Sequence, residues 1–141
     1  MYSRIVIPTD GSKNAREGVK VGLDMATKLE LPVMAIFVVD KSQLSTVQHA
    51  SLKQSLKEGL LQDGKEAMKG IREKARNKDV KLEEMIITGA PHDMIIKHTN
   101  EKDLIIMCTH GQGNLRKLFM GSVTSRVLGH AKAGVLVVRP K

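Results

Sequence analysis

Hydrophobic and polar positions alternate in blocks along the chain. Short, mostly apolar runs are separated by longer segments in which apolar residues recur every three or four positions. Continuous apolar runs indicate strands buried on both faces, whereas spacings of three and four indicate helices with one buried face. The expected strands are residues 4–8, 33–39, 80–87, 104–107 and 135–138. The expected helices are residues 12–29, 52–77, 92–99 and 122–130.

The two longest expected helices have distinct buried faces. Ser12 is placed to cap the first of them. The inward positions of this helix are Ala15, Val19, Gly22, Ala26 and Leu29. Those of the second are Leu56, Leu60, Ala67, Ile71 and Ala75. Three glycines, at positions 59, 64 and 70, predict a kink or early fraying in the second helix. Residues 40–51 are polar and predict an irregular segment or a short turn.

Strands and helices therefore alternate in the order βαβαβαβαβ. Strands that are apolar on both faces need helices on each side, which predicts a parallel sheet in a three-layer α/β/α sandwich. No linker, repeat or low-complexity tract divides the chain, so residues 1–141 are expected to form one domain. Ligands of such sheets bind beyond the carboxyl ends of the strands, where the strand order reverses.

Charge and composition narrow the classes of function. The formal net charge is +8, and residues 52–78 alone carry eight Lys or Arg against four Asp or Glu. A solvated helix face explains this excess better than a nucleic-acid surface, because only three aromatic residues are present to stack on bases. The single cysteine excludes an internal disulfide, and no apolar run approaches the roughly 20 residues of a membrane span. The first residues also lack the apolar region of a signal peptide, so a cytoplasmic location is expected.

Residues 104–124, LIIMCTHGQGNLRKLFMGSVT, carry the strongest chemical signal. A buried strand leads through a glycine-bearing loop to Gly121 and Ser122, which begin a helix. Glycine, hydroxyl groups and unpaired helix N–H groups together form a seat for phosphate. Cys108 stands at the strand exit, where a glycine would allow closer approach of an anion. His110 is a candidate catalytic base, although a role in positioning the backbone or contacting a ribose is favoured because no partner is visible.

Two further segments follow expected strands with ligand-like chemistry. Residues 8–12, PTDGS, offer a hydroxyl, a carboxylate and a glycine before a helix. Asp10 is a candidate ligand for a divalent metal bound to phosphates, and equally a local turn or cap carboxylate. Residues 38–40, VVD, present a backbone edge for adenine and a valine to pack on its face. The chain has neither a GxxxxGK[ST] P-loop nor a GxGxxG after the first strand.

These motifs resemble the universal stress protein family over essentially the whole chain. The opening IVIPTDGS is similar to the family's first strand and Asp-bearing loop, and Gly111, nine residues and Gly121-Ser122 fit the ATP-binding pattern G-x2-G-x9-G-[ST]. The resemblance implies a five-stranded parallel sheet in the order 3-2-1-4-5. It also implies that adenine lies near Thr9 and Val39 and that Asp10 lies on the phosphate and metal side. The implied binding residues are Pro8, Thr9, Asp10, Val39, Met107, Cys108, His110, Gly111, Gly121, Ser122, Val123 and Thr124.

The function implied is that of an ATP-binding stress protein, a nucleotide-dependent regulatory or chaperone-like module. The implied cofactors are ATP, or AMP or ADP, with Mg²⁺ or Mn²⁺, and hydrolysis is at most slow. The implied partner is a second copy, bound through Val135–Val138. Cys108 departs from the first glycine of the pattern, so the alternative is a protein without nucleotide that acts through its dimer surfaces. An enzyme that uses His110 as a base is a third hypothesis, and nucleic-acid binding ranks last.

Overall fold

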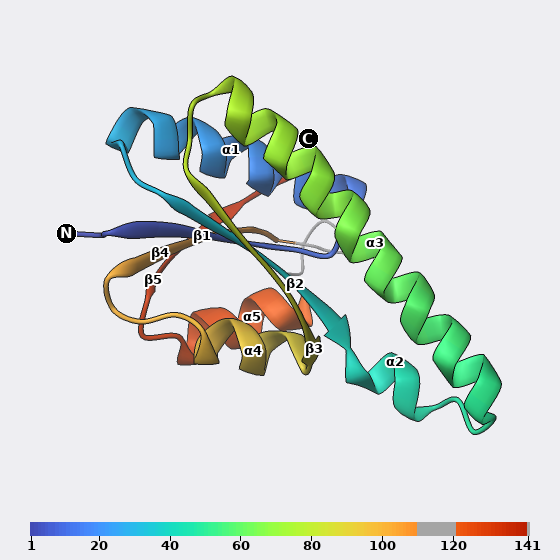
Figure 1. Cartoon of the computed structure of the whole chain (residues 1–141). Coiled ribbons are helices and arrows are strands. Elements are labelled where there is room, and N and C mark those ends of the chain that lie inside the picture. Colours follow the sequence, from blue (N-terminus) through green and yellow to red (C-terminus); the bar gives the residue numbers. More distant parts are fainter. Residues whose placement is uncertain (110–120, 141) are drawn as a thin grey trace.

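The computed structural model describes residues 1–109 and 121–140 of the chain, and its elements follow the expected order (Figure 1). The strands are β1 (Arg4–Thr9), β2 (Val33–Asp40), β3 (Leu82–Gly89), β4 (Asp103–Cys108) and β5 (Gly134–Val138). The helices are α1 (Lys13–Leu29), α2 (Lys41–Ser45), α3 (Ala50–Asn77), α4 (Pro91–Lys97) and α5 (Ser122–His130).

All these strands form one parallel sheet in the order β3-β2-β1-β4-β5, which confirms the expected fold. The first strand lies in the middle, between β2 and β4. Ile5 is in register with Val33 on one side and with Leu104 on the other. Because β2 and β3 are added on one side of β1 and β4 and β5 on the other, the strand order reverses beside β1. This reversal is the place where an open α/β sheet forms a crevice.

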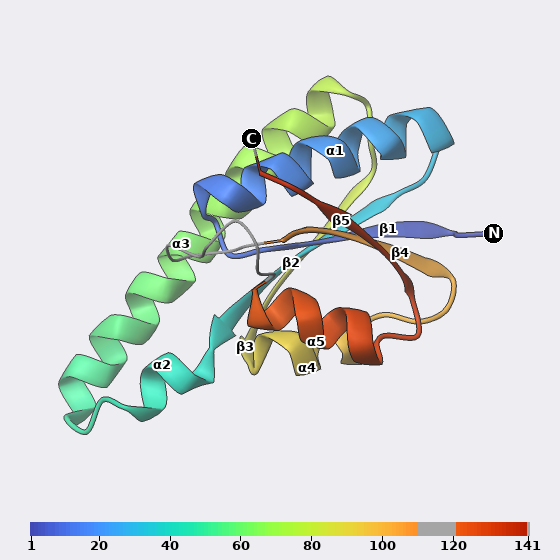
Figure 2. The same cartoon turned by 180° about the vertical axis from the view of Figure 1, so that it is seen from behind.

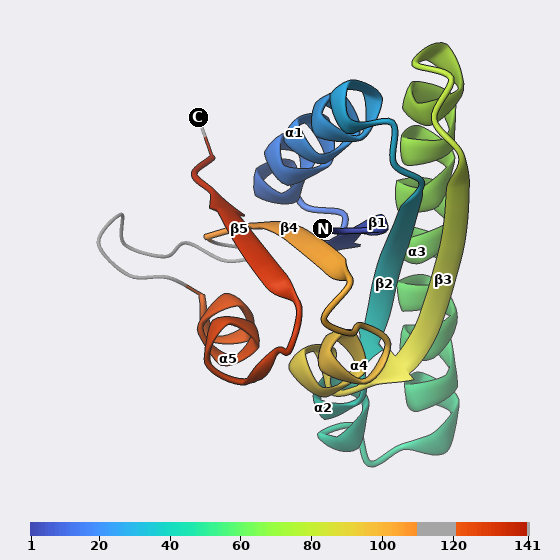
Figure 3. The ribbon, with the colours of Figure 1, turned by 90° about the vertical axis from the view of Figure 1, so that its left-hand side faces the viewer.

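The helices cover both faces of the sheet in three layers (Figure 3). One core cluster packs β1 and β2 against α1 and α3, and the other lies on the face covered by α4 and α5. Successive residues of β2 alternate between them: Ala35 and Phe37 belong to the first cluster, Ile36 and Val38 to the second. Seen from behind, α4 and α5 lie together on the face opposite to α1 and α3 (Figure 2).

Two predictions of element boundaries and one of burial were wrong, each for a local reason. Residues 40–51 contain the helix α2, because the Asp40 carboxylate accepts a hydrogen bond from the Ser42 backbone N–H at 2.9 Å and caps it. Strand β3 begins two residues late, because Val80 N–H still donates to the Ala75 carbonyl at the end of α3. Leu29, expected inside, is 50% exposed, since the chain turns directly after it.

Helix α3 is continuous over 28 residues, and its glycines do not interrupt it. Gly64 is buried against Phe37, and a Cβ at Gly64 would lie 2.9 Å from a ring carbon of Phe37. Gly64 therefore lets the helix approach β2 closely. Gly59, on the same helix, faces open space. Within the described part of the chain no helix, α3 included, has both the length and the apolar character that crossing a bilayer requires.

At the amino-terminal ends of β1 and β4, a partly buried ion pair joins the two strands. Arg4 Nε and Nη2 each donate to one carboxylate oxygen of Asp103 at 3.0 Å. Asp103 is almost fully buried and also accepts a hydrogen bond from the Asn100 N–H. The hydrogen bonds to Asp103 raise the pKa of Arg4. Such bidentate pairing fixes the relative position of two strands that are 99 residues apart in the chain.

The two glycines of α3 give opposite predictions for stability. Gly64→Ala places a methyl group against the buried Phe37 ring and should destabilise the protein by about 1–3 kcal/mol, as overpacking does. Gly59→Ala adds a methyl group in open space and should stabilise it by roughly 0.5–1 kcal/mol through helix propensity. Urea unfolding of both variants measures the difference. Equal effects of the two substitutions would show that Gly64 makes no close contact.

Candidate functional site

A cleft of about 280 Å³ lies at the carboxyl ends of β1, β2 and β4, beside the reversal of strand order. Its described walls come from the last residues of these three strands, from Asp10 in the loop after β1, and from residues of all the described helices. Nine of the residues predicted from the sequence line it: Pro8, Thr9, Asp10, Met107, Cys108, Gly121, Ser122, Val123 and Thr124. The structure thus brings together two segments that are about 100 residues apart in the chain.

The first turn of α5 forms one wall of the cleft. Gly121 is the cap residue, and no described side chain hydrogen-bonds to the N–H groups of the first turn. The first intrahelical bond is made by Ser125 N–H to the Gly121 carbonyl, so the N–H groups of Ser122, Val123 and Thr124 precede the helical ladder. The Thr124 hydroxyl donates to the Cys108 carbonyl at 2.7 Å, which anchors α5 to the end of β4. This wall therefore offers backbone N–H groups as hydrogen-bond donors, together with the positive end of a helix dipole.

The loop after β1 is held by its own side chains. The Thr9 hydroxyl accepts a hydrogen bond from Gly11 N–H at 3.1 Å, and the Asp10 carboxylate accepts one from Ser12 N–H at 2.9 Å. Gly11 has φ of +78°, a conformation that favours glycine. Asp10 is therefore a turn carboxylate and a cleft-lining residue at once. The sequence leaves open whether Asp10 is a turn carboxylate or a residue of the site, and in the structure it is both.

The described lining is acidic, although the whole chain is basic. Three aspartates, Asp10, Asp40 and Asp63, line the cleft, and no Lys, Arg or His does so among the described residues. Among those residues, no group of three potential ligands is close enough to hold a metal by itself. The described part of the site therefore offers helix N–H groups but no cationic side chain to an anion.

Alternation along β2 decides which valine meets the cleft. The side chain of Val39 is buried in the core under α1 and α3 and does not line the cleft. Val38, on the other face of β2, lines it together with Ile36, Pro91 and Ile95. These four residues form an apolar wall of the cleft. Period-two alternation within β2 is the signal that could have found Ile36 as well.

Sequence reasoning missed the wall made by α2 and α3. Gln43 of α2 and Leu60 and Asp63 of α3 line the cleft. The expected irregular segment at residues 40–51 concealed α2, and Asp63 looked like one more charge on a solvated helix. Two predicted residues, His110 and Gly111, lie outside the described residues.

The Cys108 thiol is directed toward α1. Its Sγ donates a hydrogen bond to the Asn14 carbonyl at 2.7 Å, and an added Cβ at Gly18 would lie 3.3 Å from the same sulfur. Gly18 thus leaves a notch in α1 that the thiol occupies. Burial raises the pKa of the Cys108 thiol, and the negative charges of Glu17 and Asp10 raise it further. The thiol is consequently a poor nucleophile near neutral pH.

Comparison with known proteins relates the whole chain to one family. Residues 1–139 match the model of the universal stress protein family. Universal stress protein MJ0531 of Methanocaldococcus jannaschii is 35% identical over 99% of the chain and 83% of its own length. Universal stress protein MJ0577 of the same organism is 29% identical over the full chain and 97% of its length. The solved structure of MJ0577 superposes with a TM-score of 0.86, at 31% identity over the whole chain and 98% of that structure.

Two more distant structures share the fold and carry nucleotides. One is a universal stress protein in complex with cAMP, with a TM-score of 0.68 at 20% identity, covering 98% of this chain and 97% of its own. The other is a universal stress protein of Arabidopsis thaliana with AMP bound, with a TM-score of 0.70 at 14% identity, covering 99% of this chain and 92% of its own. The agreement of fold, motif and sequence over the length of the chain leads to one conclusion: the chain belongs to the universal stress protein family.

Proposed function

We propose that this protein binds an adenine nucleotide, ATP in the first place, in the cleft at the carboxyl ends of β1, β2 and β4. The observation that carries the proposal is the first turn of α5, which no described side chain caps and which opens on a cleft beside the reversal of strand order. Helix N–H groups in this setting attract phosphate. The volume of about 280 Å³ is close to the lower end of small-molecule sites, which suits one nucleotide.

Each part of a nucleotide has a matching wall. The apolar wall of Ile36, Val38, Pro91 and Ile95 suits the base, and the first turn of α5 suits the phosphates. Relatives with the same fold carry AMP and cAMP, which favours adenine. The backbone of Val39 and residues His110 and Gly111 are further proposed contacts, carried over from the family pattern.

A divalent cation, Mg²⁺ or Mn²⁺, is proposed to enter with the nucleotide. Asp10 is the carboxylate that would hold it, and phosphate oxygens and water would complete its coordination. The donor chemistry fits, because three aspartates and no described cationic side chain line the cleft. Without a cation, the charged side chains that the phosphate chain meets in the described lining would all be carboxylates.

The proposed role is that of a cytoplasmic, nucleotide-dependent regulatory module of the stress response. The Cys108 thiol donates to the Asn14 carbonyl and the Thr124 hydroxyl donates to the Cys108 carbonyl, so these two lining groups are hydrogen-bonded to backbone oxygens and not to a general base. Binding rather than rapid turnover follows from this lining. Hydrolysis, where it occurs, is expected to be slow.

A homodimer through β5 is proposed on the contrast between the two edges of the sheet. The outer strand β3 presents Glu83 and Glu84, charges that oppose pairing with another strand. The outer strand at the other edge, β5, has the sequence GVLVV, and its Leu136 is 37% exposed. An apolar edge strand of this kind favours association with a second copy.

Calorimetric titration with Mg-ATP tests the nucleotide proposal. We expect saturable binding by the purified chain, and weaker binding after chelation of the metal. Gly121→Val should weaken binding at least about tenfold, because a branched side chain at the cap of α5 crowds the phosphate seat. Gly129→Ala, on the same helix with open space around it, is the matched control and should bind like the original chain. Absence of heat and of thermal stabilisation at millimolar nucleotide would refute the proposal.

Cys108→Gly separates the proposal from its alternative, a family member whose cleft the thiol blocks. Because the sulfur occupies the notch at Gly18 and is hydrogen-bonded to Asn14, its removal should change ATP affinity less than about threefold, or 0.7 kcal/mol. Competition titration of both proteins with a labelled nucleotide measures the ratio. A gain of more than about tenfold on removal of the thiol would favour the alternative.

Leu136→Lys tests the proposed dimer, because a lysine near a two-fold axis meets the same lysine of the second copy. We expect the original chain to sediment at twice the 15.5 kDa of one chain and the variant to sediment mainly as a monomer. Leu52→Lys is the matched control: Leu52 is equally apolar and more exposed, but it lies on α3 and should leave the dimer intact. A monomeric original chain contradicts the dimer.

A further inference from the structure

A second hollow, of about 440 Å³, lies between α1 and the C-terminal part of α3. Its described lining residues are all different from those of the cleft at the ends of the strands. Figures 1 and 2 show the two helices side by side over one face of the sheet, with the C-terminal end of the chain close by. Five cationic side chains line this hollow, which we call the basic groove: Lys13, Arg16, Lys20, Lys74 and Lys78.

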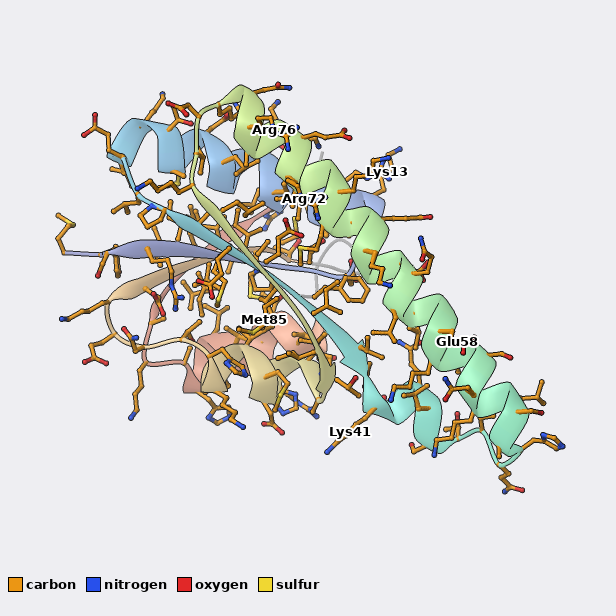
Figure 4. All side chains as sticks on the ribbon, in the orientation of Figure 1. Lys13, Lys41, Glu58, Arg72, Arg76 and Met85 are labelled. Carbon is orange, nitrogen blue, oxygen red and sulfur yellow. The ribbon has the colours of Figure 1, made fainter. Side chains whose placement is uncertain are left out.

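The spacing along the two helices brings these cations together. Lys13, Arg16 and Lys20 follow one another at intervals of three and four residues, so they share one side of α1 over about 10 Å. Lys74 and Lys78 are four residues apart at the end of α3. In Figure 4, Lys13 marks the start of α1, and Arg72 and Arg76 mark the part of α3 that adjoins the groove. The groove therefore has cations on two opposite walls.

Among the described residues, one of the five cations forms a direct ion pair. Lys78 Nζ lies 2.7 Å from the Asp24 carboxylate. The other four cations of the groove have no ion-pair partner among the described residues. Glu17 is the one carboxylate in the described lining. Hydrogen bonding to Lys78 lowers the pKa of Asp24, and the charges of Lys78, Lys20 and Lys28 lower it further. Like charges at helix spacing repel one another, so an anion in the groove would relieve a repulsion that the fold carries.

We propose that the basic groove binds a small ligand with two or three linked phosphate groups. Lysine ammonium groups suit phosphate as point charges, and a row of cations about 10 Å long suits a short phosphate chain. The described lining contains no aromatic side chain on which a base could stack, so the recognised part is the phosphate chain itself. The volume is that of a small-molecule site and not of an extended polymer track.

Titration with inorganic triphosphate, without divalent metal and at constant ionic strength, tests the proposal. We expect saturable binding and a rise in melting temperature. Lys20→Gln/Lys74→Gln removes one cation from each wall and should weaken binding at least about tenfold. Lys57→Gln/Lys65→Gln removes the same charge from exposed positions of α3 outside the groove and should bind like the original chain. Equal losses in the two double variants would show an effect of net charge alone and overturn the proposal.

Two controls separate binding in the groove from unfolding and from binding in the cleft. The groove variant should melt no lower than the original chain without ligand, because it relieves repulsion; circular dichroism checks that it is folded. With Gly121→Val, which crowds the phosphate seat of the cleft, the groove should still bind triphosphate, and adding Lys20→Gln/Lys74→Gln to this variant should remove that binding. Loss of binding in Gly121→Val would place the anion in the cleft and overturn the proposal. Sulfate that binds as tightly as triphosphate would indicate ionic screening and would also overturn the proposal. Single-stranded RNA that binds more tightly than triphosphate, in a manner that depends on Lys20 and Lys74, would indicate a nucleic-acid partner and would overturn it as well.

ATP and triphosphate should bind the groove with similar affinity when metal is absent, because only the phosphate chain is recognised. Competition between them identifies the natural source of that chain. A strong preference for ATP that the groove variant abolishes would contradict recognition of phosphate alone. The groove test does not depend on the nucleotide proposal, since failure of ATP binding in the cleft leaves the triphosphate result unchanged.

Discussion

The reversal of strand order beside β1 is the constraint on which the functional architecture depends. Because β2 and β4 both pair with β1, the helices that follow these strands lie on opposite faces of the sheet, with α1 and α3 on one face and α5 on the other. A crevice opens between them, and α5 begins at its wall. The Arg4–Asp103 ion pair at the other end of the same strands fixes β1 against β4. The position of the crevice is thus set by backbone pairing and not by the residues that line it.

Close approach of helices to the sheet gives the crevice its shape. Gly64 brings α3 onto Phe37, so that Leu60 and Asp63 become a wall of the cleft. Gly18 brings α1 onto β4 and receives the Cys108 sulfur. A cysteine at a position where the family pattern has glycine is accommodated because the neighbouring helix supplies the missing space. Gly18 and Cys108 therefore link the packing of α1 on β4 to the lining of the cleft.

The sequence was sufficient for the layers, the order of the elements and most of the cleft. Apolar runs and helical spacing are local signals, so each strand or helix can be predicted from its own residues alone. The wall formed by Gln43 and Asp63 could not be predicted, because it depends on how far α3 reaches over the sheet. Which valine of residues 38–40 faces the cleft follows from the alternation of side chains along β2, because α1 and α3 cover one face of the sheet and α4 and α5 cover the other. From the sequence, Gly64 is expected to weaken α3. Its close contact with Phe37 depends on the three-dimensional packing of α3 on β2 and has no signal in the sequence.

In the proposed complex, the first turn of α5 holds the phosphates of a nucleotide whose base lies on the apolar wall of Ile36, Val38, Pro91 and Ile95. A crystal structure of the protein grown with Mg-ATP is the decisive test. We expect phosphate density within hydrogen-bond distance of the N–H groups of Ser122 to Thr124, with a metal beside Asp10. Nucleotide bound only in the basic groove, or phosphates turned away from α5 in the cleft, would contradict it.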